Sequence, residues 1–315
     1  MIEFFNDYIV AALVLGSIYS LGAIGISMIY AILRFAHFAH GDLLTLGAYM
    51  SLGLVQKGFI VFMPLPFLVG TLGLAGEEAL APLRMGWHPA LTIPVAMVFT
   101  ALIAIGIDSL FYRPFRKSQA IIMVIASFGI ALMLRSAFQL IWGIDDHYYW
   151  PIQPPLESLE PFSISAKHLY IGGAVIVLIS ATHYLLAYTR TGKAMRAMSD
   201  DPDLARITGI PTERIVVWTW IVGAALGAAA GVLLGMDTRV RFDMGWNLLL
   251  PMFAAAILGG LGRPYGAIAG GMVIGGLEEL STIVIPGDYK SAVAFAVMVL
   301  VLIFRPQGIF KGRML

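Results

Sequence analysis

The sequence predicts an all-α polytopic membrane protein, a bundle of about eight to ten transmembrane or re-entrant helices that includes short, broken helices. Of its 315 residues, 59% are hydrophobic and only 12% are charged, which leaves too little polar surface for a soluble domain. Apolar runs of about 20 residues, long enough to cross about 30 Å of hydrocarbon as helices, recur from end to end. The alternation typical of outer-membrane barrel strands is absent, so helices must satisfy the backbone in lipid. We therefore treat residues 1–315 as one transmembrane domain.

The expected helices follow one another along the chain, and Gly or Pro shortens several of them. They cover residues 8–30, 35–55, 59–75, 89–112, 119–142, 169–188, 215–235, 248–261, 265–285 and 291–304. The amino terminus is acidic and leads into the first apolar run without a small-residue cleavage motif, which predicts a retained span rather than a cleaved signal peptide. We expect the second segment to be re-entrant or broken, with the amino terminus outside.

The distribution of Lys and Arg predicts the orientation of these helices. Basic residues gather at 113–117, at 190–214, at Arg263 and in the tail, and these positions share one side if the expected helices cross the membrane. Cytoplasmic loops carry an excess of Lys and Arg, so this side and the carboxyl terminus are expected to be cytoplasmic. The predicted outer loop, 143–167, carries acids and several Pro and falls on the opposite side.

The stretch 190–214, RTGKAMRAMSDDPDLARITGIPTER, is the one long charged segment in this apolar chain. Asp201 is a favourable N-cap, Pro202 fits the first helical position and Gly209 can close a helix in a left-handed conformation, so the stretch predicts a short helix. We expect another short helix just before it, at 193–199. Apolar side chains among charges of both signs predict a surface for another protein; the alternative is a loop lying on lipid headgroups. These apolar side chains are Met195, Met198, Leu204 and Ile207.

Glycines spaced four residues apart predict close helix packing in the second half of the chain. Small residues at this spacing let helix backbones approach, and van der Waals contact supplies the energy because lipid offers no hydrophobic driving force. The alternative is a helix interface that slides or lines a passage. The predicted packing positions are Gly223, Gly227, Gly231, Gly266 and Gly270.

Histidines in the motif AHFAHGD raise the question of a metal site. His37 and His40 have a spacing that could place two imidazoles on one metal, with a third ligand from Asp42 or from elsewhere in the chain. No second pair of ligands with such spacing accompanies them, so we expect no metal. The favoured interpretation is a helix break at Gly41, where polar side chains bond to the freed backbone groups.

Other ionisable side chains lie within or next to the apolar segments, and such groups are candidates for function. Arg135 is expected to extend to the outer interface, and Glu278 to lie near an internal cavity. Asp108 is expected to pair with Arg113 or Arg116 at the basic side. For these groups an interfacial position or an ion pair is favoured over direct contact with a substrate.

Several classes of function are excluded by what the sequence lacks. There are no cysteines, which excludes disulfides and thiolate metal sites or nucleophiles. The motif GxxxxGK[ST] is absent, so the chain does not bind ATP in that way, and HExxH and GxSxG are absent too. We therefore expect a protein that is not an enzyme, and a net charge of +1 carries no sign of a nucleic-acid partner.

Six motifs in order along the chain resemble those of the LivH-type permeases of branched-chain amino acid ABC importers. They are SMIYAILRFAHFAHGDLLTLGAYM at 27–50, FYRPFRKSQ at 111–119, GKAMRAMSDDPDLARITGI at 192–210, GAALGAAAGVLLG at 223–235, ILGGLGRPYGAIAGGMVIGGLEE at 257–279 and IFRPQGIF at 303–310. The chain departs from the family pattern at His37, where Asn is usual, near Asp108, where Glu is usual, at Pro251, and in a longer 69–88 region. The departures at Pro251 and in the 69–88 region concern the outer vestibule of the permease and its translocation path.

The resemblance implies a subunit of an importer in a bacterial inner membrane, with residues 1–315 as its permease domain. Its partners would be a homologous second permease of the LivM type, two cytoplasmic ATPase subunits and a periplasmic solute-binding protein, with membrane lipid around the bundle. ATP and Mg would bind to the ATPases, with no cofactor in this chain. Residues implied in ATPase coupling are Gly192, Arg196, Asp200, Asp201, Pro202, Leu204, Arg206 and Gly209. Residues implied in the translocation path or a helix break are His40, Gly41, Asp42, Gly259, Gly260, Gly262 and Glu278.

Two alternatives to branched-chain amino acid import stay open. The same class of importer also serves urea, amides and aromatic acids, and related systems share the AHG(D/E) and RPQG signatures. A self-sufficient secondary transporter or channel is the alternative from another class. It would need paired acids or an ion site at mid-depth, whereas the ionisable groups in this sequence lie mostly near the expected interfaces.

Overall fold

The computed structural model describes residues 5–56, 88–116, 118–149, 164–305 and 308–309. Every regular element there is a helix, apart from one isolated β-bridge between His147 and Val240, so the predicted all-α class is confirmed. The α-helices are α2 (Val10–Leu33), α3 (His40–Gln56), α6 (Pro89–Ile107), α7 (Ala120–Trp142), α8 (Ala166–Tyr188), α9 (Arg190–Asp200), α10 (Pro202–Ile207), α11 (Thr212–Asp237), α12 (Met244–Gly259), α13 (Pro264–Ser281) and α14 (Lys290–Phe304). Short π- and 3-10 turns are η1 (Phe5–Ile9), η3 (Asp108–Tyr112), η4 (Arg113–Phe115) and η6 (Gly287–Tyr289).

Five helical stretches in the described residues are long and apolar enough to cross a membrane, which confirms a polytopic membrane protein. They are α2, α6 with its continuation to Phe115, α7, α8 and α11, while α12 and α14 are shorter apolar helices. The predicted helix 59–75, most of the predicted outer loop and most of the tail beyond α14 lie outside the described residues.

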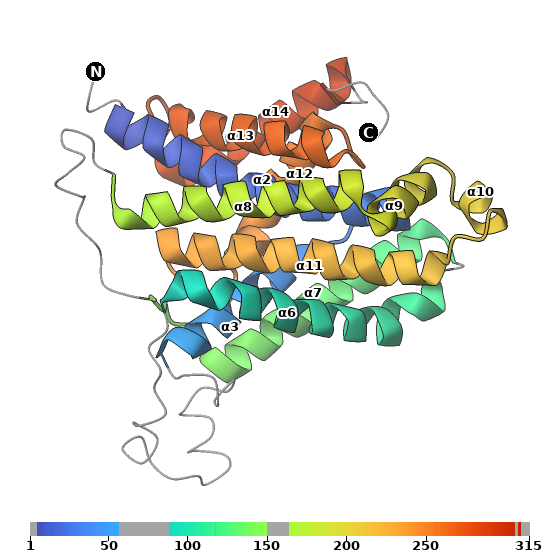
Figure 1. Cartoon of the computed structure of the whole chain (residues 1–315). Coiled ribbons are helices and arrows are strands. Elements are labelled where there is room, and N and C mark those ends of the chain that lie inside the picture. Colours follow the sequence, from blue (N-terminus) through green and yellow to red (C-terminus); the bar gives the residue numbers. More distant parts are fainter. Residues whose placement is uncertain (1–4, 57–87, 117, 150–163, 306–307, 310–315) are drawn as a thin grey trace, which may run out of the picture.

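Helices α2 and α11 form the centre of the bundle. In the most apolar 18-residue stretch of each helix, 89% of the residues of α2 and 78% of those of α11 are buried inside the protein. The corresponding shares are 39% for α6, 28% for α7 and 22% for α8. α2 packs along α13, α11 and α12, and α11 also packs against α6 and α3 (Figure 1). α6, α7 and α8 therefore present broad apolar faces to their surroundings, as helices at the edge of a membrane bundle do.

The glycines of the predicted packing ridges lie where helix backbones meet. A Cβ on Gly223 would lie 2.9 Å from the Ile29 side chain on α2, one on Gly227 would lie 3.2 Å from the His40 ring, and one on Gly231 would overlap the Leu44 carbonyl oxygen on α3. On α13, a Cβ on Gly266 would overlap the Gly259 carbonyl and one on Gly270 the Ala255 carbonyl, both on α12. The approaches at Gly231, Gly266 and Gly270 are between helix backbones, which only small residues allow, whereas Gly223 and Gly227 make room for side chains.

The helix break predicted at Gly41 is wrong in its position. α2 ends at Arg34, which adopts a left-handed conformation with φ of 58°, and α3 begins at His40, so Gly41 is helical. Gly41 is needed for packing instead, because a Cβ there would overlap the backbone carbonyl of Gly245 on α12. Thr45 reinforces this approach by accepting a hydrogen bond of 3.0 Å from the Gly245 N–H.

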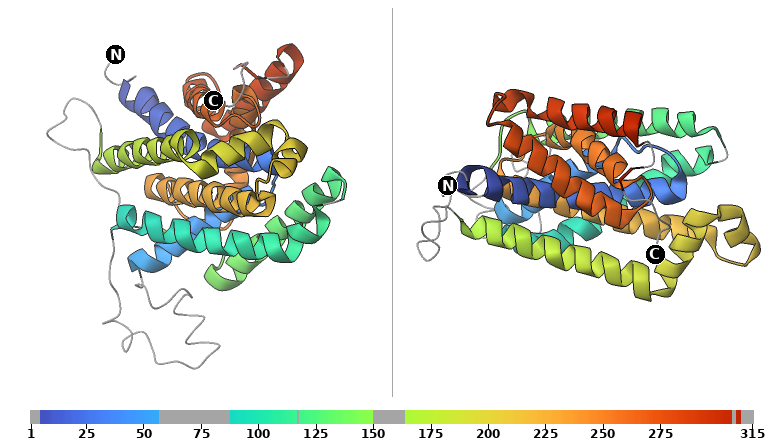
Figure 2. Two further views of the ribbon diagram at one scale, coloured as in Figure 1. Left: turned by 45° about the vertical axis from the view of Figure 1, so that its right-hand side comes forward. Right: turned by 90° about the horizontal axis from the view of Figure 1, so that it is seen from above.

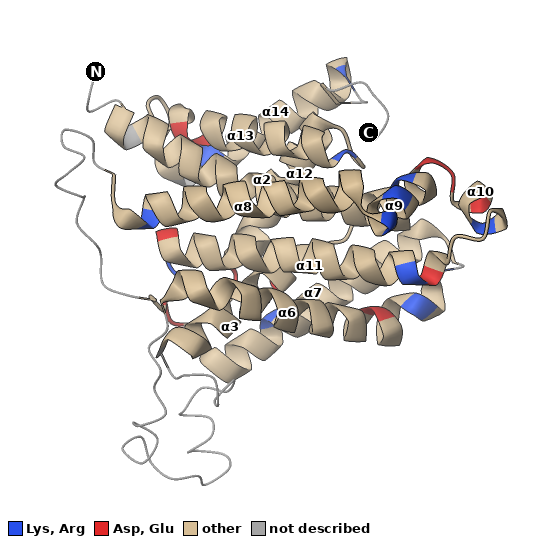
Figure 3. Ribbon diagram, viewed as in Figure 1, with Lys and Arg blue, Asp and Glu red and all other residues tan. Residues whose placement is uncertain are grey.

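Charged residues gather at the two ends of the bundle (Figure 3). α9 and α10 project beyond the other helices at one end, close to the start of α11 (Figure 1, Figure 2). At the opposite end Arg239 pairs with Asp146 at 2.9 Å, and Arg241 pairs with Asp243 through two bonds of 2.6 Å. Burial raises the pKa of Asp243, but the hydrogen bonds and charge of Arg241 outweigh it and hold this pKa below its usual value.

Candidate functional site

The segment predicted as a protein-binding surface forms two helices, and both begin at a side-chain cap. The Thr189 hydroxyl caps α9 and accepts a hydrogen bond of 3.0 Å from the Gly192 N–H. Asp201 caps α10, because its Oδ1 accepts bonds from the N–H of Asp203 at 3.0 Å and of Leu204 at 2.9 Å. The predicted N-cap is confirmed, and α9 extends beyond the predicted first helix at both ends.

The residues that begin and end α10 also have the positions that the sequence predicts. Pro202 lies in the first turn of α10, where its missing N–H would have no helical partner. Gly209 has a φ of 85°, the left-handed conformation that ends the helix. Gly192 is needed for close packing instead, since a Cβ there would overlap the backbone of Leu185 and Leu186 in α8. The α8–α9 corner is therefore tight, and α9 cannot shift without moving α8.

The apolar side chains of the segment divide into two groups. Met195 and Met198 are only 3% and 7% exposed, because α9 lies with its apolar face on the bundle. Leu204 and Ile207 on α10 are 54% and 80% exposed. The prediction that all four side chains face a partner is thus wrong for the methionines. Of the predicted coupling residues, Asp200, Asp201, Pro202, Leu204, Arg206 and Gly209 are exposed, Arg196 is half-buried and Gly192 is buried.

The projecting helices are bonded to the central helix of the bundle. Arg34, at the end of α2, donates a hydrogen bond from Nη2 to the Ser199 carbonyl in α9. The α12–α13 turn reaches the same end of α2, where a Cβ on Gly262 would lie 3.7 Å from Ala31. In that turn Gly260 and Gly262 have φ angles of 101° and 83°. The predicted break at these glycines therefore coincides with a reversal of the chain beside α2.

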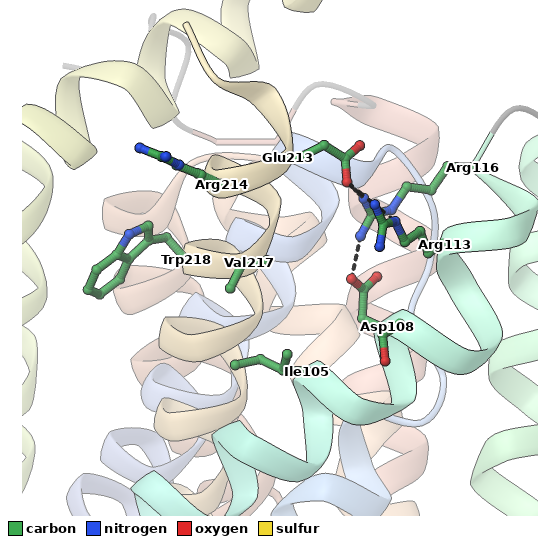
Figure 4. Close-up of a pocket in the computed structure, with 9 residues that line it drawn as sticks. Ile105, Asp108, Arg113, Arg116, Glu213, Arg214, Val217 and Trp218 are labelled. Carbon is green, nitrogen blue, oxygen red and sulfur yellow. Dashed lines mark hydrogen bonds and ion pairs between the residues drawn. The ribbon is translucent and has the colours of Figure 1, made fainter.

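A network of ion pairs joins α6 and its extension to the start of α11 (Figure 4). Arg116 lies between two acids: it pairs with the buried Asp108 and, at 2.6 Å, with Glu213. Arg113 is 3.9 Å from Glu213 and mostly exposed, so of the two predicted partners of Asp108 it is Arg116 that bonds to it. The network borders a cavity of about 380 Å³ whose other lining residues are Ile105, Ser109, Arg214, Val217 and Trp218.

Asp42 and Arg135 form an ion pair inside the bundle. Asp42 is fully buried on α3, and the Nε and Nη2 atoms of Arg135 on α7 each lie 3.4 Å from its carboxylate oxygens. The Arg135 guanidinium also lies over the Trp246 ring of α12, 4.4 Å from its centroid. Of the two positions favoured from the sequence, an interfacial one or an ion pair, Arg135 forms the ion pair, and a carboxylate and an aromatic face hold it among three helices.

Glu278 lies between α13 and α2. It is fully buried, and its carboxylate accepts a hydrogen bond of 2.5 Å from the Tyr19 hydroxyl. The neighbouring Glu279 has a separate role, because it pairs with Lys290 at 2.6 Å at the start of α14. Sequence spacing does not identify Tyr19 as the partner of Glu278 or Lys290 as the partner of Glu279.

The two histidines lie at the α2–α3 connection among aromatic rings. Their ring centroids are 6.1 Å apart, and the described residues contain no group of three side chains that could hold a metal. The Nε2 of His37 lies 3.0 Å from the Tyr112 hydroxyl, and the ring meets Trp220 edge-on at 4.9 Å. Tyr112 and Trp220 stack at 5.2 Å, a cluster that sequence reasoning missed because its members come from three separate segments.

The fold and these sites define an all-α polytopic membrane protein with ionisable groups buried between its helices and a short exposed helix at one end. Residues 8–302 match the family described as branched-chain amino acid transport system / permease component, and the chain belongs to that family.

Curated relatives carry the same description along nearly their whole length. The high-affinity branched-chain amino acid transport system permease protein LivH of Salmonella typhimurium is 32% identical over 305 residues, which are 95% of this chain and 92% of that protein. The corresponding permease protein BraD of Pseudomonas aeruginosa is 30% identical over 311 residues, with 97% and 95% covered. A probable LivH permease of Methanocaldococcus jannaschii is 26% identical over 310 residues, with 95% and 90% covered.

Proposed function

We propose that this chain is the permease subunit of an ATP-driven ABC importer that moves branched-chain or related amino acids inward by alternating access. Its similarity over nearly the whole length of permeases of that description supports the substrate class. The observation that carries the proposal is the exposed, side-chain-capped α10 at the end of a helix pair bonded to the bundle centre. An ATP-driven transport protein whose own sequence lacks an ATP-binding motif needs a surface on which a separate ATPase can act.

The partners follow from this assignment. Two cytoplasmic ATPase subunits bind ATP and Mg²⁺, and this chain holds no cofactor of its own. A homologous second permease of the LivM type completes the transmembrane path, and a periplasmic solute-binding protein delivers the amino acid. Selection of the solute rests mainly on that protein, so the permease pair needs a path rather than a tight pocket.

The end of the bundle that carries α9 and α10 is the cytoplasmic end in this proposal. The basic residues of α9, α10 and η4 and the start of α11 favour this orientation under the positive-inside rule. The helix α14 finishes at the same end (Figure 1), which supports a cytoplasmic carboxyl terminus. The membrane is the inner membrane of a bacterium.

Movement of an ATPase reaches the bundle through the contacts of α9. Closure of the ATPase pair pushes on α10, and the tight α8–α9 corner at Gly192 transmits the push to α8. The Arg34–Ser199 bond transmits it to the end of α2, beside the α12–α13 turn. Because α2 packs along α11, α12 and α13, a shift of its end changes the angles among the central helices.

Uptake by proteoliposomes tests the proposal. The chain is reconstituted with the second permease, with or without the ATPase subunits, and radiolabelled leucine is supplied with the cognate binding protein. We expect uptake only with the ATPases and ATP. Uptake by this chain alone, without ATP, would instead identify a self-sufficient transporter or channel and overturn the proposal.

A further inference from the structure

Arg135 carries a partly buried charge on an apolar helix. It lies 15 residues after the start of α7 at Ala120, and α7 ends at Trp142, about 10 Å further along the axis. Large apolar side chains cover the outer face of α7, among them Phe128 and Leu132, at 42% and 47% exposed. The Arg135 side chain is itself 17% exposed. A charge at this depth is costly toward hydrocarbon, so this face calls for water or a polar partner.

The ion pair with Asp42 uses only part of the guanidinium. Both bonds leave from one edge, Nε and Nη2, and at 3.4 Å they are longer than the 2.7–2.9 Å typical of charge-assisted hydrogen bonds. A guanidinium has five N–H donors, so the edge formed by Nη1 and Nη2 keeps donors with no acceptor in the described part of the chain. Such an edge matches a carboxylate through two parallel hydrogen bonds.

Asp42 and Trp246 hold this edge in place. The close approach of Gly41 and Gly245 joins α3 to α12, and each glycine is followed directly by one of the two residues that contact Arg135. The Asp42 carboxylate is fully buried, so it orients Arg135 without being able to touch a solute itself. A pre-oriented guanidinium loses less side-chain entropy when it binds.

Aromatic rings from α7, α12 and the α2–α3 connection extend in a row from Arg135. Phe128 meets Trp246 edge-on at 5.8 Å and Phe38 at 6.3 Å, and Phe38 lies 5.6 Å from Phe253. A carboxylate-binding edge next to a row of apolar rings suits a small molecule with a carboxylate at one end and an apolar side chain at the other. Apolar amino acids have this chemistry.

We propose that Arg135 contacts the carboxylate of the transported amino acid during its passage, while the apolar side chain lies against Trp246 and Phe128. Asp42 is the positioning residue for Arg135. The inference rests on the proposed import of apolar amino acids and deepens it, because it assigns a point in the path where the solute is recognised after it leaves the binding protein.

A set of charge-neutralising variants separates this role from a structural ion pair. Complete transporters carry the native permease, Asp42→Asn, or Asp42→Asn with Arg135→Gln, and initial leucine uptake is measured with saturating binding protein and ATP. Asp42→Asn keeps the Arg135 guanidinium but orients it less firmly, so uptake is lowered without being abolished. Loss of a charged hydrogen-bond donor should then lower uptake in the double variant at least about tenfold relative to Asp42→Asn. A smaller loss overturns the inference. If the ion pair were only structural, the double variant would contain no unpaired buried charge, and its uptake would match that of Asp42→Asn.

A second measurement compares two reagents on one and the same variant, so a difference in folding between variants cannot explain its result. The chain contains no cysteine, so Arg135→Cys in the Asp42→Asn background introduces a single thiol into this subunit. Treatment of the transporter with a cationic aminoethyl methanethiosulfonate should restore leucine uptake, whereas the anionic sulfonatoethyl reagent should not. Equal effects of the two reagents overturn the inference.

The native transporter tells the two proposals apart. If it takes up no amino acid with ATP, binding protein and all subunits present, the proposed function fails. If it takes up leucine and the double variant equals Asp42→Asn, the proposed function stands and only the role of Arg135 fails.

Discussion

The Tyr19 hydroxyl donates a hydrogen bond of 2.5 Å to the Glu278 carboxylate and joins α2 to α13 across 259 positions of the chain. Both side chains lie in the interior, at 3% and 0% exposed. The other carboxylate oxygen, Oε1, has no partner among the described residues. The buried Glu278 carboxylate therefore depends on a single hydrogen-bond donor among the described residues.

Removal of that donor should destabilise the protein. Tyr19→Phe is expected to lower the free energy of unfolding by about 1–3 kcal/mol, because it leaves the Glu278 carboxylate buried without a partner. Thermal unfolding of the purified protein in detergent measures the change. Tyr19→Phe combined with Glu278→Leu removes both partners and should recover most of the loss. If Tyr19→Phe matches the native protein, the bond contributes nothing.

A methyl group on the α11 ridge should be costly where the facing atom is backbone. Gly231→Ala is expected to destabilise the protein by about 1–3 kcal/mol, because its Cβ would overlap the Leu44 carbonyl and push α11 away from α3. Gly129→Ala on α7 is the matched control, since no atom lies within 4 Å of its added Cβ. The control should be neutral or slightly stabilising, as Ala limits the unfolded chain. Similar melting temperatures for the two variants would count against the packing role.

The two acids that flank Arg116 should contribute unequally to stability. Asp108→Asn is expected to cost about 1.5–3 kcal/mol, because Asp108 is buried and bonds directly to the guanidinium. Glu213→Gln should cost less than about 1 kcal/mol, since the Glu213 side chain is 65% exposed and water screens its charge. Unfolding in detergent at low and high salt tests both, and only the small Glu213 effect should fade with salt. The reverse order would contradict this assignment.

How far the sequence predicts such features depends on the separation of the residues involved. The Asp201 cap and the left-handed Gly209 are predictable because their bonds reach only two or three residues along the chain. The Asp42–Arg135 pair spans 93 positions, and helix length and polarity do not tell which faces of two helices meet. Gly41 shows the same limit. Its sequence context suggests a helix break, but glycine is needed there because the backbone of Gly245, on another helix, lies against it.

The last prediction concerns the exposed tip of the segment 190–214. Leu204→Glu should uncouple transport, with uptake at least about tenfold lower while the ATPases continue to hydrolyse ATP, because it puts a charge at the centre of the proposed contact. Leu204 is 54% exposed, so neither folding nor membrane insertion should suffer. Asp201→Ala should act in the same direction by removing the cap of α10, worth about 1 kcal/mol, and replacement of Arg196 is expected to do so too.

Leu204→Met is the matched control for this prediction, because it keeps an apolar side chain of similar volume at the same exposed position. It should preserve both leucine uptake and the ratio of uptake to ATP hydrolysis in proteoliposomes. If Leu204→Glu, Asp201→Ala and the Arg196 variant all kept that ratio unchanged, α10 would not be the ATPase contact. Loss of coupling in Leu204→Glu but not in Leu204→Met would instead mean that the ATPase contacts an apolar surface on α10, since the two variants differ at one side chain.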